Sequence, residues 1–433
     1  MLQVTKLAGL LQTLFTTTAD QLARLTHFVQ RQGKITGANF AQTLVFEWMR
    51  DPRATVETLA RKLDLSQQGL DSRFTPQARL FLQQLLRRAL QVALRARRQP
   101  QGLLDRFDSV IVEDTTSIKL PEQLAPLFPG TDGSTKTAAV KVDLRWDLRT
   151  GEILWLTVHV GKASDSRLAA DPADLPKNGL YLADLGFFSL RHRRSFAAGQ
   201  YWISRVAAGT KVKVAQAWLE WPRWLQSADE SLIDESRQLG QTDPLPVRLI
   251  ARRCPTAVAA ERRRRCHARA EKACRGKASR LQLAACDWQV WATNVPPSVL
   301  STREVDTVYR CRWQVELFFK RAKSLGGWQI DARNRGDRVL VELWSKLLGV
   351  VVAHWLVLVR GGLLGGASLW KLMKVVQEYA GRLRESVSDA EQLARSVEHI
   401  GNELRRVPQQ RRSRRKPLTF QTLQTPTTSS TTG

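Results

Sequence analysis

The patterning between Phe107 and Val206 constrains the fold more than any other feature of this sequence. Short apolar runs lie between turn residues there: FDSVIVEDTT, AAVKVDLRWD, ILWLTVHV, GLYLADLGFFS and QYWISRV. Runs of this length and alternation are typical of strands, and TGE between the second and third indicates a hairpin turn. Because helical patterns flank and interrupt the runs, we predict an α/β sheet rather than a helical bundle.

Residues 1–100 are predicted to form an α-helical, DNA-binding N-terminal domain. Within them, TVETLARKLDLSQQGLDSRF (residues 55–74) resembles a helix-turn-helix. Leu59 and Leu63 would face the core, Asp64 would make the turn, and Ser66 would cap the second helix. Helical hairpins that bind nothing share this pattern, so DNA contact and a purely structural role stay open here.

Residues 211–298 are predicted to be a β-rich insertion with a basic helix. VRLIARRC and WQVWATNV have strand patterns, and AAERRRRCHARAEKACRGKASRLQ lies between them. Acidic residues are scarce in that basic run, which favours phosphate binding over a solvated charged face. Two strands around a basic helix are therefore expected.

The C-terminal part is predicted to be helical to about residue 400. LLGVVVAHWLVLV (residues 347–359) is too short to span a bilayer and contains His354, so it indicates a buried core helix. A GGLLGG break (residues 361–366) precedes a C-terminal helical region, residues 361–400. The basic and then Thr/Ser-rich residues 401–433 are predicted to be a disordered tail.

Charge is the strongest functional clue in the composition. The 433 residues contain 67 Lys and Arg against 40 Asp and Glu, a net charge of +27, which favours a polyanionic partner. Five cysteines without C-x-x-C spacing argue against a disulfide framework and structural zinc. The first residues lack the pattern of a secretory signal, so we expect a reduced, cytoplasmic protein that does not enter a membrane.

The segment YRCRWQVELFFKRAKSLGGW (residues 309–328) groups its charges and aromatic residues unusually. On one helix with about 100° per residue, a single narrow stripe holds the tyrosine and the charged side chains: Tyr309, Arg312, Glu316, Lys320 and Lys323. The adjacent face is apolar and is expected to pack: Cys311, Val315, Phe318, Phe319 and Ala322. Alone, this stripe is also compatible with surface ion pairs at helical spacing.

Two predicted strands each end in an aspartate, Asp114 in VIVED and Asp184 in LYLAD. Together with Glu316 on the helix, they supply the hard oxygen ligands that two Mg²⁺ ions about 3.5–4 Å apart require. Arg, Lys and Tyr around such a site would hold phosphates. Strand alternation alone does not choose between Glu113 and Asp114.

These residues resemble the DDE transposases of bacterial insertion sequences, in the insertion-sequence-four group. Its signature, Tyr-x2-Arg-x3-Glu-x6-Lys, is matched by Tyr309, Arg312, Glu316 and Lys323 without a change of spacing. EDTTSIKL resembles the first aspartate block, which selects Asp114, and YLADLGFFS resembles the second. The resemblance runs from about Phe107 to Val359 and is weaker in residues 1–100.

The resemblance implies a ribonuclease-H-like catalytic domain, here residues 105–210 and 299–360, interrupted by the insertion. It implies that Asp114, Asp184 and Glu316 bind two Mg²⁺, for which Mn²⁺ would substitute. Water would cleave a strand at the transposon end, and the freed 3′-OH would attack target DNA. Tyr309, Arg312, Lys320 and Lys323 would contact phosphates. Double-stranded DNA with terminal inverted repeats, a homodimer and a bacterial, nucleoid-associated location are also implied.

Leu185 departs from the family pattern, since a basic residue often follows the second aspartate in relatives. Three nearby arginines are expected to bind DNA instead: Arg191, Arg193 and Arg194. Asp143 and Asp147 are expected to have surface or hairpin-turn roles, and Trp288 and Trp291 are favoured as core residues over a base-stacking role.

Two other functions are compatible with the same residues. One is a metal-dependent, structure-selective nuclease of the same fold, and the other is a catalytically inactive DNA-binding relative. All three acidic residues are present, which argues against the inactive relative. Terminal inverted repeats in the flanking DNA would separate the transposase from the nuclease.

Overall fold

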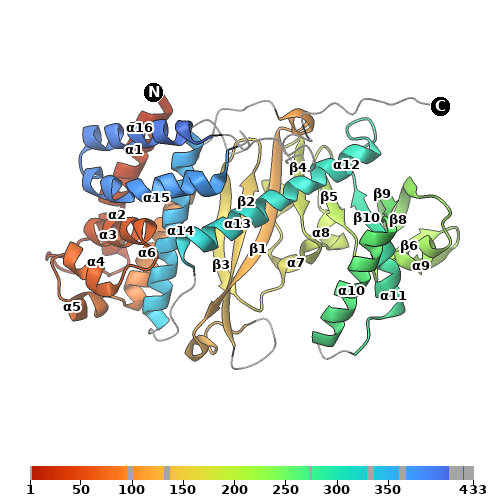
Figure 1. The fold of residues 1–433 in the computed structure, drawn as a ribbon, viewed down its shortest axis with the longest axis horizontal. Coiled ribbons are helices and arrows are strands. Elements are labelled where there is room, and N and C mark those ends of the chain that lie inside the picture. Colours follow the sequence, from red (N-terminus) through yellow and green to blue (C-terminus); the bar gives the residue numbers. More distant parts are fainter. Residues whose placement is uncertain are drawn as a thin grey trace. The chain divides into compact units, whose positions relative to one another are not determined.

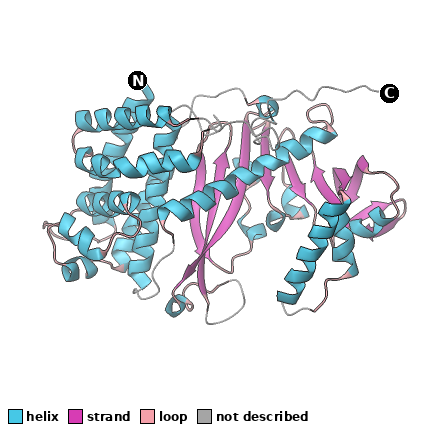
Figure 2. Cartoon of the chain, in the orientation of Figure 1, coloured by secondary structure: helices cyan, strands magenta, loops and turns pink. Residues whose placement is uncertain are grey.

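The computed structural model describes residues 2–92, 94, 101–130, 137–272, 276–328, 336–359, 367–408 and 423. Helices and strands are both abundant, as Figure 2 shows, so the predicted α/β class is confirmed. The chain divides into two compact units. Unit 1 contains residues 1–100, 114–163 and 313–420, and unit 2 contains residues 101–113, 164–312 and 421–433.

Unit 1 combines helices from both ends of the chain with a short part of the sheet (Figure 1). Its N-terminal helices are α1 (Leu2–Thr13), the π-helical turn η1 (Leu14–Thr18), α2 (Ala19–Leu25), α3 (Gly37–Arg50), α4 (Val56–Lys62), α5 (Gln67–Asp71) and α6 (Pro76–Leu90). Its later helices are α13 (Trp313–Gly326), α14 (Gly336–Val359), α15 (Leu369–Ser386) and α16 (Ala390–Arg406). Helix α14 packs against α3 and α6, α15 against α3, and α16 against α1. Helices predicted as separate N- and C-terminal regions therefore share one core.

The predicted helix-turn-helix geometry is present in α4 and α5. Asp64 lies between the helices with a φ of 53°, in the left-handed region that reverses the chain. The Ser66 side chain accepts a hydrogen bond from the Gly69 amide and so caps α5. Leu59 and Leu63 are buried. DNA contact by this hairpin stays a prediction.

The strands of unit 1 follow the order β3, β2, β1. They are the second part of β1 (Ser109–Leu120), β2 (Ala138–Asp147) and β3 (Ile153–Val160), with the short helix η3 (Glu122–Leu124) after β1. β2 and β3 form the predicted antiparallel hairpin. Asp147 accepts hydrogen bonds from the Arg149 amide and the Thr150 hydroxyl, which confirms its predicted turn role.

Unit 2 contains the first part of β1 and the remaining strands, in the order β1, β4, β5, β10, β9, β8, β6, β7. These are β4 (Gly179–Ala183), β5 (Tyr201–Arg205), β6 (Lys211–Val214), β7 (Ala217–Glu220), β8 (Leu232–Leu239), β9 (Leu245–Arg253) and β10 (Trp288–Thr293). β1, β4 and β5 are parallel, whereas β10 pairs antiparallel with both β5 and β9. The strands of the predicted insertion thus continue the sheet.

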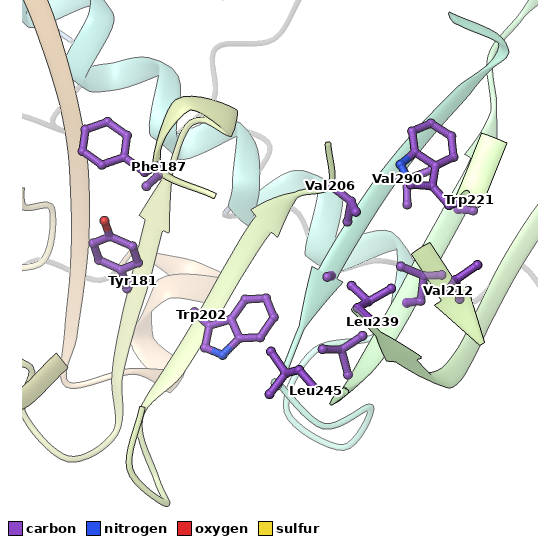
Figure 3. Close-up of a cluster of buried hydrophobic side chains, with 14 of the residues drawn as sticks. Tyr181, Phe187, Trp202, Val206, Val212, Trp221, Leu239, Leu245 and Val290 are labelled. Carbon is purple, nitrogen blue, oxygen red and sulfur yellow. The ribbon is translucent and has the colours of Figure 1, made fainter. Parts of the chain in front are cut away.

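The helices of unit 2 are short except for α10. They are η2 (Gly102–Arg106), α7 (Asp165–Leu168), η4 (Pro172–Asp174), η5 (Leu185–Phe187), α8 (Leu190–Arg194), α9 (Trp221–Gln226), α10 (Thr256–Lys272), α11 (Arg280–Ala284), η6 (Ala285–Asp287), α12 (Thr302–Tyr309) and η7 (Arg310–Arg312). A cluster of buried side chains along the strands forms the core of this unit, with Tyr181, Trp202, Val212 and Val290 among them (Figure 3). Trp288 and Trp291 are buried as predicted.

Helix α12 is anchored by ion pairs before it reaches the signature segment. Glu304 in its first turn accepts two hydrogen bonds of 2.9 Å from the Arg106 guanidinium. Arg252 on β9 lies 3.0 Å from Asp306. Burial alone would raise the pKa of Glu304, but the hydrogen bonds from Arg106 and Ser301 lower it to about 2. These contacts fix the helix that carries Tyr309.

Helix α14 contains the apolar run predicted to be a core helix. By length and composition alone, residues 336–358 could cross a membrane. However, 94% of their most apolar window is buried inside the protein, as expected for the core helix of a soluble protein. His354 is buried there, and burial lowers its pKa to about 4. The core-helix prediction is confirmed.

Several predictions concern the ends of the C-terminal region. Helix α16 continues to Arg406, past the predicted start of the tail at residue 401. The predicted GGLLGG break and, apart from Leu423, the tail from residue 409 onward lie outside the described residues.

Candidate active site

Asp114 lies within β1 rather than at its end, because β1 continues to Leu120. The strand is fully buried from Ser109 to Glu113 and becomes half-buried from Asp114 to Thr116. The Thr115 amide donates a 2.9 Å hydrogen bond to the Asp114 carboxylate. Glu113 is fully buried on the opposite face of the strand, so the less buried of the two neighbouring acids is Asp114.

Asp184 follows β4 directly. The register pairs Glu113 of β1 with Ala183 of β4, so Asp114 and Asp184 are each the next residue along two adjacent parallel strands. The Asp184 side chain is 51% exposed. It therefore has solvent access at the point where its strand ends.

The signature segment is not the single helix that the sequence analysis assumed. Helix α12 ends at Tyr309, residues 310–312 form the 3₁₀ turn η7, and α13 begins at Trp313. A 3₁₀ turn advances by about 120° per residue instead of 100°, so residues 309–323 do not form one regular α-helix. The predicted packing face is confirmed, since its members are all buried: Cys311, Val315, Phe318, Phe319 and Ala322.

Tyr309 is a buried residue at the end of α12. Its side chain is 8% exposed, and its hydroxyl donates a 3.2 Å hydrogen bond to the carbonyl of Ala183. Burial raises the pKa of Tyr309 to about 12, so the hydroxyl stays protonated at neutral pH. The first residue of the signature thus contacts the backbone next to Asp184, and its phosphate contact stays a prediction.

Arg312 lies close to Asp184. Its Nε is 3.8 Å from the Asp184 carboxylate, and its side chain is only 11% exposed. Its guanidinium carbon is 6.0 Å from the centre of the Tyr309 ring. A largely buried cation beside a carboxylate differs from the solvated surface pair considered as the alternative, because water screens it less.

The remaining signature residues belong to α13. Glu316 is half-buried and Lys320 is exposed. The Lys323 ammonium donates a 2.8 Å hydrogen bond to the Ser117 carbonyl of β1, and burial lowers its pKa. Lys323 thus fixes α13 beside the second part of β1.

A groove of about 640 Å³ lies between that part of β1 and α13. Lys119, Lys320, Lys323 and Trp328 are among its lining residues. The sequence analysis missed Lys119 and Trp328. Lys119 could have been found from strand alternation, because it is two residues from Ser117 and so shares its face of β1. Three lysines around one groove favour an anionic ligand.

The three arginines predicted after Asp184 have different environments. Arg191 is exposed on α8. Arg194 pairs with Asp243 and also donates to its carbonyl at 2.7 Å. Arg193 is only 2% exposed and packs on the Tyr181 ring, which corrects the prediction that it binds DNA.

Two further observations concern acidic residues. Asp143 on β2 is 1% exposed and lies 4.0 Å from His159, so its predicted surface role is wrong. Among the described residues, no three or more His, Cys, Asp and Glu side chains are close enough to share a metal ion. Asp114 and Glu316 belong to unit 1 and Asp184 to unit 2.

Comparison of the sequence with known proteins identifies a family. Residues 105–350 match the family described as the transposase DDE domain. The transposase for insertion sequence element IS231F of Bacillus thuringiensis subsp. israelensis is 25% identical over 414 residues, covering 88% of this chain and 87% of the relative. The transposase for IS231B of Bacillus thuringiensis subsp. berliner is 24% identical over 362 residues, covering 77% and 75%. The transposase for IS1151 of Clostridium perfringens is 25% identical over 366 residues, covering 78% and 77%.

The family match covers more than half of the chain, and it coincides with both aspartate blocks and the signature segment. Membership implies action on DNA and dependence on divalent metal ions, in agreement with the net charge of +27. The chain therefore belongs to the DDE transposases, enzymes of the insertion-sequence-four type that move insertion sequences.

Proposed function

We propose that this transposase cleaves insertion-sequence ends at terminal inverted repeats and joins the 3′-OH to target DNA, with Asp114, Asp184 and Glu316 as its metal ligands. The register of β1 and β4 supports this proposal, because its last pair, Glu113 and Ala183, directly precedes Asp114 and Asp184 along two parallel strands. Equivalent positions on neighbouring strands share one face and one edge of a sheet. Family membership favours transposition over the nuclease and the inactive relative.

The donor set fits Mg²⁺. All three side chains are carboxylates, the hard oxygen ligands that Mg²⁺ prefers, and all three are half-buried or exposed and thus reachable by water. Two Mg²⁺ ions, replaceable by Mn²⁺, would supply activation of a water nucleophile and stabilisation of the leaving oxygen. The proposal requires the three carboxylates to converge on these ions.

The basic side chains have separate roles in this proposal. Arg312 orients the Asp184 carboxylate, near which it lies. Lys320 and Lys119 bind DNA phosphates in the groove beside α13, and Lys323 both bridges to β1 and adds positive charge there. Exposed Arg191 extends the basic surface. Phosphate contacts of this kind position DNA without reading its sequence.

We assign the catalytic domain to the ribonuclease-H-like class. Parallel β1, β4 and β5, an antiparallel β2–β3 hairpin and a helix that carries the third acid support this assignment. With this assignment we propose residues 105–210 and 299–360 as its catalytic segments. Because both ends of an insertion sequence must be joined, we also propose a homodimer in the DNA complex, associated with the bacterial nucleoid.

Single substitutions of the three acids test the function. Asp114→Asn, Asp184→Asn and Glu316→Gln each remove a metal-binding charge with little change of shape. We expect each variant to lose cleavage of linear DNA that carries the inverted repeats flanking its gene, while binding that DNA as tightly as the wild type. Asp229→Asn is the control, since Asp229 is exposed in the loop before β8. Normal cleavage by Glu316→Gln, with Mg²⁺ or Mn²⁺, would contradict the assignment.

A further inference from the structure

Glu113, the acid next to Asp114, has no place in the proposed chemistry and yet is buried at 0% exposure. Its carboxylate accepts hydrogen bonds from the Tyr181 hydroxyl on β4 and from the Ala170 amide, the latter at 2.9 Å. Burying a carboxylate in an apolar core is unfavourable unless such bonds compensate it. A buried ionisable group of this kind is weak evidence for stability alone, which is compatible with a second role.

Arg193 on α8 supplies a positive charge to the cluster. Its guanidinium carbon lies 4.9 Å from the Tyr181 ring centre and 5.6 Å from that of Trp202. Burial lowers the pKa of Arg193, whereas Tyr181 and Glu113 act to raise it. Arginine stays protonated in proteins, so the cluster contains a buried cation beside the Glu113 carboxyl group.

His192 links Arg193 to Ala170. The contacts among Glu113, Tyr181, Arg193, His192 and Ala170 thus form a ring, which we call the circuit. Its Nε2 lies 2.6 Å from the Ala170 carbonyl, and its Nδ1 lies 2.8 Å from Nη1 of Arg193. A neutral imidazole that donates from Nε2 and accepts at Nδ1 satisfies both contacts. The Ala170 amide donates a hydrogen bond to Glu113, and the Ala170 carbonyl accepts one from His192, so the backbone of Ala170 links Glu113 to His192.

The circuit spans the two strands that lead to the catalytic aspartates. Ile111 pairs with Tyr181 and Glu113 pairs with Ala183, so the Tyr181 hydroxyl reaches diagonally across to the Glu113 carboxylate. Figure 3 shows Tyr181 on its strand within the buried cluster of unit 2. Since side chains alternate along a strand, Asp114 faces away from Glu113. The circuit therefore contacts β1 from the face opposite to Asp114.

We propose that the Glu113–Tyr181–Arg193 circuit is a positioning device that sets the register of β1 against β4 up to the pair of Glu113 and Ala183, the residues that directly precede Asp114 and Asp184. It rests on the proposed function, because this register matters for catalysis only if both aspartates bind the same metal ions. Carboxylate ligands displaced by a fraction of an ångström bind Mg²⁺ poorly, because this ion requires near-ideal octahedral geometry. All three circuit residues are buried, so the proposal gives none of them a direct contact with DNA or metal.

Tyr181→Phe is the sharpest test, since it removes one hydroxyl and keeps the ring under Arg193. We expect single-turnover cleavage of end DNA to fall about tenfold at limiting Mg²⁺, and the Mg²⁺ midpoint to rise several-fold. Affinity for end DNA should stay within twofold. Glu113→Gln, which keeps an acceptor for both donors, should lose less than Glu113→Ala. Tyr201→Phe on neighbouring β5 is the matched control and should behave as the wild type.

Hydrogen exchange in the metal-free, DNA-free protein provides a readout that is independent of activity. We expect amides of residues 179–184 to exchange faster in Tyr181→Phe and in Glu113→Gln than in the wild type and Tyr201→Phe. If Tyr181→Phe only lowers the melting temperature, with an unchanged Mg²⁺ midpoint and exchange rate, the circuit is ordinary core packing and the inference is wrong. If the wild type itself does not cleave end DNA, the proposed function fails instead.

Discussion

Replacing Tyr309 by Phe distinguishes a positioning role for the signature tyrosine from a phosphate contact. The structure shows one hydrogen bond to lose, from the hydroxyl to the Ala183 carbonyl at 3.2 Å. Such a bond contributes about 1 kcal/mol net, and a buried polar group left unpaired costs about 1–3 kcal/mol. A carbonyl oxygen can accept two hydrogen bonds, so we expect a loss near 1 kcal/mol in the free energy of unfolding.

The same change should slow DNA cleavage because Ala183 precedes Asp184. If the whole of about 1 kcal/mol is expressed in the transition state, cleavage slows about fivefold. The pKa of Tyr309 is raised from 10 to about 12, and the direction of this shift predicts how stability depends on pH. The neutral form is favoured in the folded protein, so the contribution of this hydroxyl is complete below pH 10 and is lost as the pH rises toward 12. The effect of Tyr309→Phe should therefore be constant from pH 7 to 9.

The assay combines chemical denaturation, single-turnover cleavage and a salt titration of DNA binding. Tyr379→Phe on α15 is the control, since that ring packs on His399 far along the sequence from the signature. If Tyr309 instead contacts a phosphate, Tyr309→Phe should leave stability unchanged and weaken DNA binding. That pair of results would refute the positioning role.

Three further predictions concern buried charges and the basic helix. The pKa of Glu304 is lowered, so its ion pair with Arg106 stabilises the fold above pH 4.5 and this stabilisation is lost as the pH falls toward 2. Glu304→Gln should therefore reduce the free energy of unfolding, measured by denaturation, at pH 7 but not at pH 2. The depressed pKa of His354 means that acid destabilises the protein progressively between pH 6.5 and 4, and His354→Leu should flatten stability over that window in thermal melts. If α10 binds phosphates, Arg269→Gln and Lys272→Gln should each lower the slope of log affinity against log salt for duplex DNA by about 0.9, and an unchanged slope would contradict this.

The local pattern of residues was sufficient to predict much of the architecture. The strand runs after Phe107, the β2–β3 hairpin, the cap at Ser66 and the buried helix around Leu347 were all predicted, because periodicity, turn residues and caps act over a few neighbouring residues. The residue spacing within 309–323 was likewise sufficient to predict the family, since spacing along the chain is a property of sequence alone.

Environments set by residues distant in the chain could not be predicted in this way. The burial of Arg193 depends on Tyr181 and Trp202, and that of Tyr309 depends on the backbone at Ala183. Without these contacts, an arginine or a tyrosine in a basic segment is reasonably expected to bind phosphate.

The sequence by itself determined the strand runs between Phe107 and Val206, the basic charge, and the family signature with its three acids. Only the tertiary structure decided which charged side chains are buried, that a 3₁₀ turn interrupts the signature at residues 310–312, and that Glu113 faces a buried circuit while Asp114 faces away. The physical reason is the range of the interactions: propensity and periodicity act between neighbours, whereas desolvation and hydrogen-bond pairing depend on partners that only folding brings together.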